Sequence, residues 1–315
     1  MQIGLKQLIE PGLKPLVNES QQFIEARKAA AQGKKQPDLT TPSGLQEARE
    51  ARKPSGRLLD RQVVESIAEA DGRKVPVRII KPKQAKPRGV YLDIHGGGFY
   101  LESAARGDTQ NAHLADALGA TVVSVDYRLA PENPWPAAPD DCATAAFWLV
   151  KQAKSLFGTT RLLIGGASAG STLTMTSLLR LRDNNLIAPF LGAVLQFGAY
   201  DLSGQTPGGR RYADEYFIQA YVGKVANKTQ PDISPLYGDL KGLPPALMVV
   251  GTADILLEDT FAMAARLSAA GGEVDLRVYP EAVHGFTSHP TKMGAAARQD
   301  IINWLKERLD SSALV

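Results

Sequence analysis

Short apolar runs alternate with segments of helical period along most of the chain. The first two runs, 63–67 and 75–80, flank Asp71-Gly72, which is a strong signal for a β-hairpin. Further apolar runs predict strands at 89–95, 121–127, 161–167, 191–197, 246–251 and 274–279. Helices are predicted at 106–118, 139–156, from the end of the fifth strand to about 183, 258–270 and 294–309. Two antiparallel strands followed by repeated strand–helix units predict an α/β fold, with an eight-stranded, mostly parallel sheet and helices on both faces.

Two segments depart from this rhythm. Residues 1–50 have apolar positions at helical spacing and no strand character, and Pro37 and Pro42 interrupt their end. Residues 202–240 are rich in Gly, Pro and Tyr and are too long for a simple loop, so we expect an insertion above the sheet. The pattern therefore predicts an N-terminal helical segment at 1–50 and a main domain at 51–315 that carries the insertion.

Composition excludes several classes of protein. The 315 residues are 44% hydrophobic and 22% charged, as in ordinary globular proteins, with a net charge of +3. Residues 1–90 hold 18 Lys and Arg against 10 Asp and Glu, but these cations are scattered and have no aromatic residues among them. We therefore expect a solvated surface and no nucleic-acid partner.

The cysteine and histidine content and the N-terminus limit the cofactors and the location. Cys142 is the one cysteine, so an intrachain disulfide is impossible, and four histidines show no zinc-binding spacing. Pro11 and Pro15 interrupt the N-terminus, which lacks the apolar core of a signal peptide, and no run is long enough to span a bilayer. These features predict a reduced, cytoplasmic setting without a membrane span.

The strongest candidate for chemistry is a serine in a Gly-x-Ser-x-Gly turn, Gly166-Ala-Ser168-Ala-Gly170, which follows the apolar run 161–167. A tight turn from a strand into a helix exposes the serine hydroxyl and directs the helix N-terminus at a developing oxyanion. The two glycines would let strand and helix approach closely. The pattern also occurs in ordinary loops, so the other predicted residues have to support this interpretation.

A second candidate is the run His95-Gly-Gly-Gly98, which directly follows a predicted strand. Consecutive glycines allow several backbone N–H groups to turn toward one point, as an oxyanion hole requires. We expect Gly97, Gly98 and the N–H of Ala169 to be the donors and His95 to shape the loop. A merely flexible loop is the alternative.

The candidate base and acid follow the last two predicted strands. His284 comes after the final strand and completes the order serine, aspartate, histidine, whereas His289 is its rival and His113 lies inside a helix. Asp254 follows the penultimate strand and would orient the imidazole. Asp201, after the strand before that, is the alternative acid, although it fits the role of capping a loop.

Together these residues resemble the hormone-sensitive-lipase-like (bacterial family IV) carboxylesterases of the α/β-hydrolase superfamily, over about residues 60–310. The motifs that carry the resemblance are His95-Gly-Gly-Gly98, Asp126-Tyr-Arg-Leu-Ala-Pro-Glu132, Gly166-Ala-Ser168-Ala-Gly170, Asp254, and His284-Gly-Phe286. The resemblance implies an α/β-hydrolase fold with a helical cap built from 1–50 and 202–240, and a small-molecule ester as substrate. It also implies Ser168 as nucleophile, His284 as base and Asp254 as acid, with Gly97, Gly98 and Ala169 binding the oxyanion.

The same resemblance implies no metal or organic cofactor, a preference for short- to medium-chain esters, and a homodimer as a common assembly. Tyr127 and Arg128 of the Asp126–Glu132 motif are expected to support the glycine loop. Ala167, Ser171 and Ile255 differ from the residues that are common in the family, which leaves the pocket shape open. A non-hydrolytic receptor on the same fold and an amidase or peptidase are the alternative functions.

Overall fold

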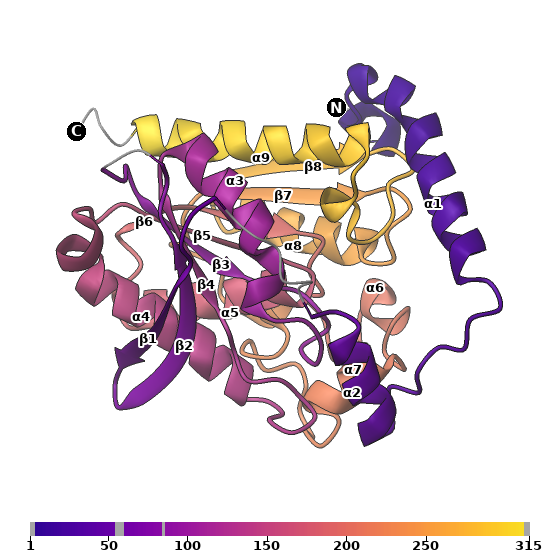
Figure 1. The fold of residues 1–315 in the computed structure, drawn as a ribbon, viewed down its shortest axis with the longest axis horizontal. Coiled ribbons are helices and arrows are strands. Elements are labelled where there is room, and N and C mark those ends of the chain that lie inside the picture. Colours follow the sequence, from indigo (N-terminus) through magenta and orange to yellow (C-terminus); the bar gives the residue numbers. More distant parts are fainter. Residues whose placement is uncertain (1–3, 54–59, 84–85, 312–315) are drawn as a thin grey trace.

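The computed structural model describes residues 4–53, 60–83 and 86–311 and has an eight-stranded sheet at its centre (Figure 1). The strand order is β1-β2-β4-β3-β5-β6-β7-β8. The strands are β1 Val64–Ala70, β2 Arg73–Ile80, β3 Val90–Ile94, β4 Thr121–Val125, β5 Leu162–Ala167, β6 Phe190–Gln196, β7 Ala246–Gly251 and β8 Val274–Tyr279. β2 pairs antiparallel with β1 and β4, and all other pairs are parallel. The predicted α/β fold with a mostly parallel sheet is confirmed.

The first two strands form the predicted hairpin. Asp71 and Gly72 connect them, and their φ angles are 51° and 77°. A two-residue type I′ turn needs positive φ at both positions, and an Asp-Gly pair meets that need at low cost.

Helices cover both faces of the sheet. On one face, α3 (Asp108–Leu118) and α9 (Lys292–Ser311) share a hydrophobic cluster with Tyr91 of β3. On the other face, α4 (Ala137–Phe157), α5 (Ala169–Asp183) and α8 (Leu257–Ala269) pack with Leu92 of the same strand. Neighbouring residues of one strand therefore belong to different clusters, because successive side chains point to opposite faces of the sheet.

The remaining helices are short or lie outside these two layers. They are η1 Leu5–Leu8, η2 Pro11–Leu16, α1 Val17–Ala31, α2 Pro42–Glu50, η3 Ala104–Gly107, α6 Pro207–Arg210, α7 Tyr216–Val222, η4 Pro235–Tyr237 and η5 Phe286–Ser288. In Figure 1, α2, α6 and α7 lie near one another at one side of the molecule. The two segments that broke the strand–helix rhythm thus both contain helices and no strand among their described residues.

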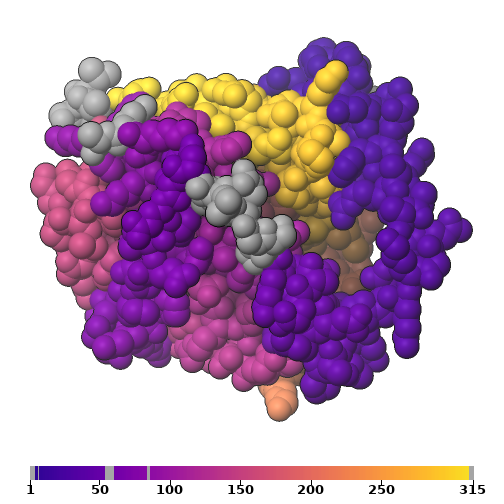
Figure 2. Space-filling model, viewed as in Figure 1, coloured from indigo at the N-terminus to yellow at the C-terminus, as the bar shows by residue number. Residues whose placement is uncertain are grey.

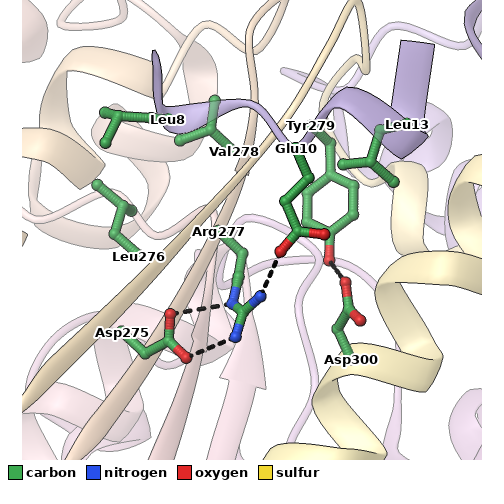
Figure 3. A pocket seen from close by; sticks show the side chains of 9 residues that line it. All are labelled: Leu8, Glu10, Leu13, Asp275, Leu276, Arg277, Val278, Tyr279 and Asp300. Atoms are coloured by element: carbon green, nitrogen blue, oxygen red, sulfur yellow. Dashed lines mark hydrogen bonds and ion pairs between the residues drawn. The ribbon is translucent and has the colours of Figure 1, made fainter. Parts of the chain in front are cut away.

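The beginning of the described chain packs against the far end of the sheet. Leu8 and Leu13 lie over β8, and the Glu10 carboxylate is 2.7 Å from Nη1 of Arg277 (Figure 3). A cavity of about 150 Å³ lies between this segment, β8 and α9. Farther along, α1 is mostly exposed, and Ser20 is its one buried residue. The N-terminal segment therefore buries apolar side chains at its two ends, Leu13 in η2 and Leu45 and Ala48 in α2, and leaves α1 between them mostly exposed.

Two further features bear on the expectations from composition. Cys142 is fully buried in α4, and burial raises the pKa of its thiol well above the ordinary value. Within the described ranges, every helix is too short or too polar to cross a lipid bilayer.

Candidate active site

Ser168 lies in the turn that joins β5 to α5, in a backbone conformation that L-residues rarely adopt (φ 56°, ψ −122°). A Cβ atom on Gly166 would lie 2.5 Å from the carbonyl oxygen of Ile94, and one on Gly170 would overlap the same oxygen. Only glycine fits at either position, because β3 passes directly beside the turn. The Ser168 N–H donates to the carbonyl of Gln196 in β6 at 2.9 Å, which anchors the turn to the sheet.

His284 and Asp254 complete a continuous chain of hydrogen bonds to this serine. Nε2 of His284 is 2.9 Å from Oγ of Ser168, and its Nδ1 is 3.0 Å from both carboxylate oxygens of Asp254. With the proton on Nδ1, the imidazole donates to Asp254 and accepts from the Ser168 hydroxyl. The three residues come from loops that follow β5, β7 and β8, so the parallel sheet brings them together at its carboxyl edge.

The side chains of Asp254 and His284 differ in how far they are exposed to solvent. The Asp254 side chain is fully buried, and its Oδ1 also accepts the N–H of Leu256 at 2.8 Å. The His284 side chain is 39% exposed, and Phe197 places its ring edge-on at 5.1 Å from the imidazole. A buried carboxylate therefore fixes one side of the imidazole, whereas the side toward Ser168 is open to a reactant.

The glycine loop follows β3 and lies against the serine turn. A Cβ on Gly96 would be 2.7 Å from the carbonyl oxygen of Ala167 and 3.5 Å from Cβ of Ser168. Gly97 and Gly98 have φ angles of 100° and 61°, which other residues rarely adopt. Among the described residues, no acceptor binds the N–H groups of Gly97, Gly98 or Ala169. Three backbone donors thus remain available beside Ser168.

His95 and Tyr127 support this loop from behind. Their rings stack at 4.1 Å, and the Tyr127 hydroxyl lies 3.0 Å and 3.1 Å from the carbonyl oxygens of His95 and Gly96. Burial lowers the pKa of His95 to about 4, so its ring is neutral near pH 7. The expectation for Tyr127 agrees with these contacts. That for Arg128 is wrong, since its guanidinium binds Asp141 of α4 at 2.8 Å.

The rival residues of the sequence analysis have other partners. Asp201 is buried and accepts from the backbone N–H of Ser203 at 3.0 Å and of Thr206 at 2.8 Å, so it caps its own loop. Nε2 of His289 lies 2.9 Å from a guanidinium nitrogen of Arg27 in α1. His113 is exposed on α3.

One buried carboxyl near the site was not anticipated. Asp259, in the first turn of α8, accepts from the backbone N–H groups of Tyr200 and Asp201 and from the Tyr212 hydroxyl at 2.7 Å. Burial raises the pKa of its carboxyl to about 6. An acidic residue in the first turn of a helix is common, so the sequence carried no signal that this one is buried.

Comparisons with known proteins agree with this geometry. A family model described as an alpha/beta hydrolase fold matches residues 91–288. Ethyl acetate hydrolase of Pseudomonas putida is 35% identical over an alignment of 236 residues that covers 70% of this chain and 74% of that protein. Carboxylesterase NlhH of Mycobacterium tuberculosis is 31% identical over an alignment of 279 residues that covers 82% of this chain and 87% of that protein.

A solved structure extends the similarity to three dimensions. The hyperthermophilic esterase from Pyrobaculum calidifontis superposes with a TM-score of 0.77 at 28% identity, covering 86% of this chain and 94% of that one. The chain therefore belongs to the α/β-hydrolase fold family. Within that superfamily, the resemblance to the hormone-sensitive-lipase-like carboxylesterases is confirmed by relatives that are named as esterases and carboxylesterases.

Proposed function

We propose that this chain is a serine carboxylesterase that hydrolyses short- to medium-chain carboxylic esters through a covalent acyl-enzyme. Ser168 is the nucleophile, His284 the general base and acid, and Asp254 the residue that orients the imidazole. The hydrogen-bonded chain from Asp254 through His284 to Ser168 is the observation that carries this proposal. Family membership and the names of the relatives support ester hydrolysis as the reaction class.

In the first half of the reaction, the Ser168 oxygen attacks the ester carbonyl carbon while His284 accepts the hydroxyl proton. The carbonyl oxygen becomes an oxyanion, which the N–H groups of Gly97, Gly98 and Ala169 bind. Loss of one such donor typically costs about 10²–10³ in rate. Asp254 stabilises the imidazolium that forms. His284 then gives its proton to the leaving alkoxide, so the alcohol departs and the acyl group stays on Ser168.

The second half repeats these roles with water as nucleophile. His284 accepts a proton from water as the water oxygen attacks the acyl carbon, and the same three N–H groups bind the second oxyanion. His284 then returns a proton to the Ser168 oxygen, and the carboxylic acid leaves. Every proton in both halves is transferred through His284, between Ser168, the leaving alcohol and water, so the proposed reaction uses no metal and no organic cofactor.

We attribute the preference for short- to medium-chain acyl groups to a cap over the active site. Parts of 1–50 and 202–240 form this cap on the main domain 51–315. Contacts between α7 and the glycine loop support it. The Phe99 ring stacks on Tyr221 at 4.0 Å, and the Tyr100 ring meets Tyr216 edge-on at 5.4 Å. Large aromatic side chains beside a catalytic loop leave limited room for a long acyl chain.

Kinetics with p-nitrophenyl esters of increasing chain length test the proposal. We expect kcat/KM to be highest for short and medium chains and to fall for long ones. Ser168→Ala should abolish turnover with the fold intact, because the nucleophile is missing, whereas Ser171→Ala, in the first turn of α5, should retain it. A serine-directed phosphonate should add its mass to the peptide that contains Ser168. Turnover that survives in a folded Ser168→Ala variant would contradict the proposal.

The alternative functions are tested with the same preparation. A matched ester and amide pair separates an esterase from an amidase, and tight binding without turnover of any activated ester would indicate a receptor. A cytoplasmic location and a homodimer stay predictions. Light scattering on the purified chain tests the second of these.

A further inference from the structure

The side chain of Arg49, in the last turn of α2, binds the glycine loop from the N-terminal segment. Its Nε donates to the carbonyl oxygen of Tyr100 at 2.9 Å, and its Nη2 donates to that of Ala130 at 2.8 Å. Both terminal nitrogens also bind the Glu132 carboxylate, at 2.7 Å and 2.9 Å. The Arg49 side chain is 20% exposed, so much of this guanidinium is removed from water.

These acceptors join two segments that are distant in sequence but adjacent in space. Tyr100 is two residues after Gly98. Ala130 and Glu132 belong to the Asp126–Glu132 motif, whose acidic end had no assigned purpose. The two segments also bind each other directly, since the Ala130 N–H donates to the Phe99 carbonyl at 3.0 Å. Arg49 therefore cross-links the glycine loop to the motif behind it.

The backbone of the loop explains why such a cross-link matters. Gly97, Gly98, Phe99 and Glu102 all have positive φ angles. A non-glycine residue in this region is strained and persists only where its surroundings hold it. The direction of the Gly97 and Gly98 N–H groups depends on this same run of dihedral angles. A displacement of about 1 Å in a catalytic group can cost about 10²-fold in rate.

We propose that Arg49 is a positioning residue for the glycine loop, so that the N-terminal segment acts on catalysis through the Tyr100 and Ala130 carbonyls. The inference rests on the proposed function, in which Gly97 and Gly98 bind the oxyanion. The fork shape of arginine is needed, because its nitrogens reach two carbonyls and one carboxylate at once, whereas a lysine ammonium is a point charge on a flexible stem.

The test compares Arg49→Ala with the wild type in ester hydrolysis and in binding of an alkyl trifluoromethyl ketone. In the ketone adduct, the Ser168 oxygen bonds to the carbonyl carbon, its proton goes to His284, and the ketone oxygen becomes an oxyanion. We expect kcat to fall about 10- to 100-fold with KM changed by less than about threefold, and the ketone Ki to rise by a similar factor as kcat falls. Active-site titration with the serine-directed phosphonate counts the catalytically competent molecules. Expressing kcat per titrated site then corrects it for any partly unfolded protein.

Three further variants sharpen the test. Lys53→Ala removes a cation just after the same end of α2. Among the described residues Lys53 pairs with Glu50 of that helix alone, so this variant should leave kcat and Ki unchanged. Glu132→Gln keeps both carbonyl contacts of Arg49 and should lower kcat by less than about threefold, as is usual for an exposed ion pair. Arg49→Lys should fall between Arg49→Ala and the wild type.

Two outcomes would overturn the inference. A kcat of Arg49→Ala equal to that of the wild type, per titrated site, excludes a positioning role. A lower kcat with an unchanged ketone Ki means that the loss does not arise at the oxyanion. Failure of the proposed function gives a different result, because wild-type turnover would then be absent or would survive in Ser168→Ala.

Discussion

Two buried aspartates, Asp254 and Asp201, follow neighbouring strands of the sheet, and their hydrogen bonds distinguish them. Both oxygens of Asp254 face Nδ1 of His284, whereas Asp201 accepts from Ser203 and Thr206 of its own loop. An amide in place of the first carboxylate can hold the imidazole in the wrong tautomer. An amide in place of the second only weakens a loop.

We therefore expect Asp254→Asn to lower kcat for a short p-nitrophenyl ester by about 10⁴ at neutral pH. Asp201→Asn should change kcat by less than about tenfold and lower the free energy of unfolding by about 1–3 kcal/mol, because buried donors lose an ionised acceptor. Steady-state kinetics and urea unfolding of both variants check this. Equal losses of kcat would contradict the assignment of the acid.

At the scale of residues, the sequence was sufficient to predict those site residues whose position after a strand is visible in the sequence itself. Ser168 and the glycine loop directly follow strands, and His284 lies in the loop after β8. Parallel strands end at one edge of a sheet, so their proximity could be inferred. Arg49 had no such signal, because its partners Tyr100 and Glu132 are 51 and 83 residues away. Its role depends on how α2 packs, which neither charge nor spacing reveals.

At the scale of elements, Asp259 links the start of α8 to the loop that follows β6 and to the insertion that contains Tyr212. One of its oxygens accepts all three hydrogen bonds, and Oδ1 is buried without a partner among the described residues. Burial raises the pKa of this carboxyl from 3.8 to about 6, so the folded state holds the proton over a range in which the unfolded state has lost it.

The free energy of unfolding should therefore decrease as pH rises from about 4 to 6, by up to about 3 kcal/mol from this group. Asp259→Asn keeps an oxygen for the three donors and cannot ionise. We expect its stability relative to the wild type to increase over that interval and to level off above it. Urea unfolding of both proteins at pH 4, 5, 6 and 7 measures the difference. Parallel pH curves for the two proteins would show that Asp259 does not titrate in this way.

The elements themselves were predictable to within a few residues where the apolar pattern was regular. The fifth strand was expected at 161–167 and spans Leu162–Ala167, and the last helix was expected at 294–309 and spans Lys292–Ser311. The helix expected at 106–118 begins at Asp108, after the 3-10 turn Ala104–Gly107. Helix ends depend on caps and local turns, which leave weaker traces than the apolar face does.

At the scale of the whole molecule, the N-terminal segment lies on the outside of one side of the molecule, shown in indigo in Figure 2. Its first turns pack against β8 and α9, where Leu13 is 9% exposed. Farther on, α1 contacts the region after β8 through Arg27 and His289, and Glu19 accepts the Lys292 N–H at 3.0 Å. The segment thus contacts the main domain near α9 and again at the glycine loop.

We expect Leu13→Ala to weaken the first of these contacts by about 2 kcal/mol, because a buried leucine is lost at the edge of the core. Hydrogen exchange of the η2 and α1 amides should accelerate by about 30-fold, since 1.4 kcal/mol corresponds to a factor of ten. Leu5→Ala, at a side chain 40% exposed, is the control and should change exchange little. Exchange rates that stay at the wild-type level in Leu13→Ala would mean that the segment is held by other contacts.

The burial of Cys142 has a practical consequence for following these contacts in solution. It is the one cysteine of the sequence, it is fully buried in α4, and the raised pKa of its thiol suppresses the reactive thiolate. A thiol introduced at an exposed position of α2 would therefore react with maleimide dyes far faster than the native one. The unaltered background of this chain already suits site-specific fluorescent labelling, without prior removal of a cysteine.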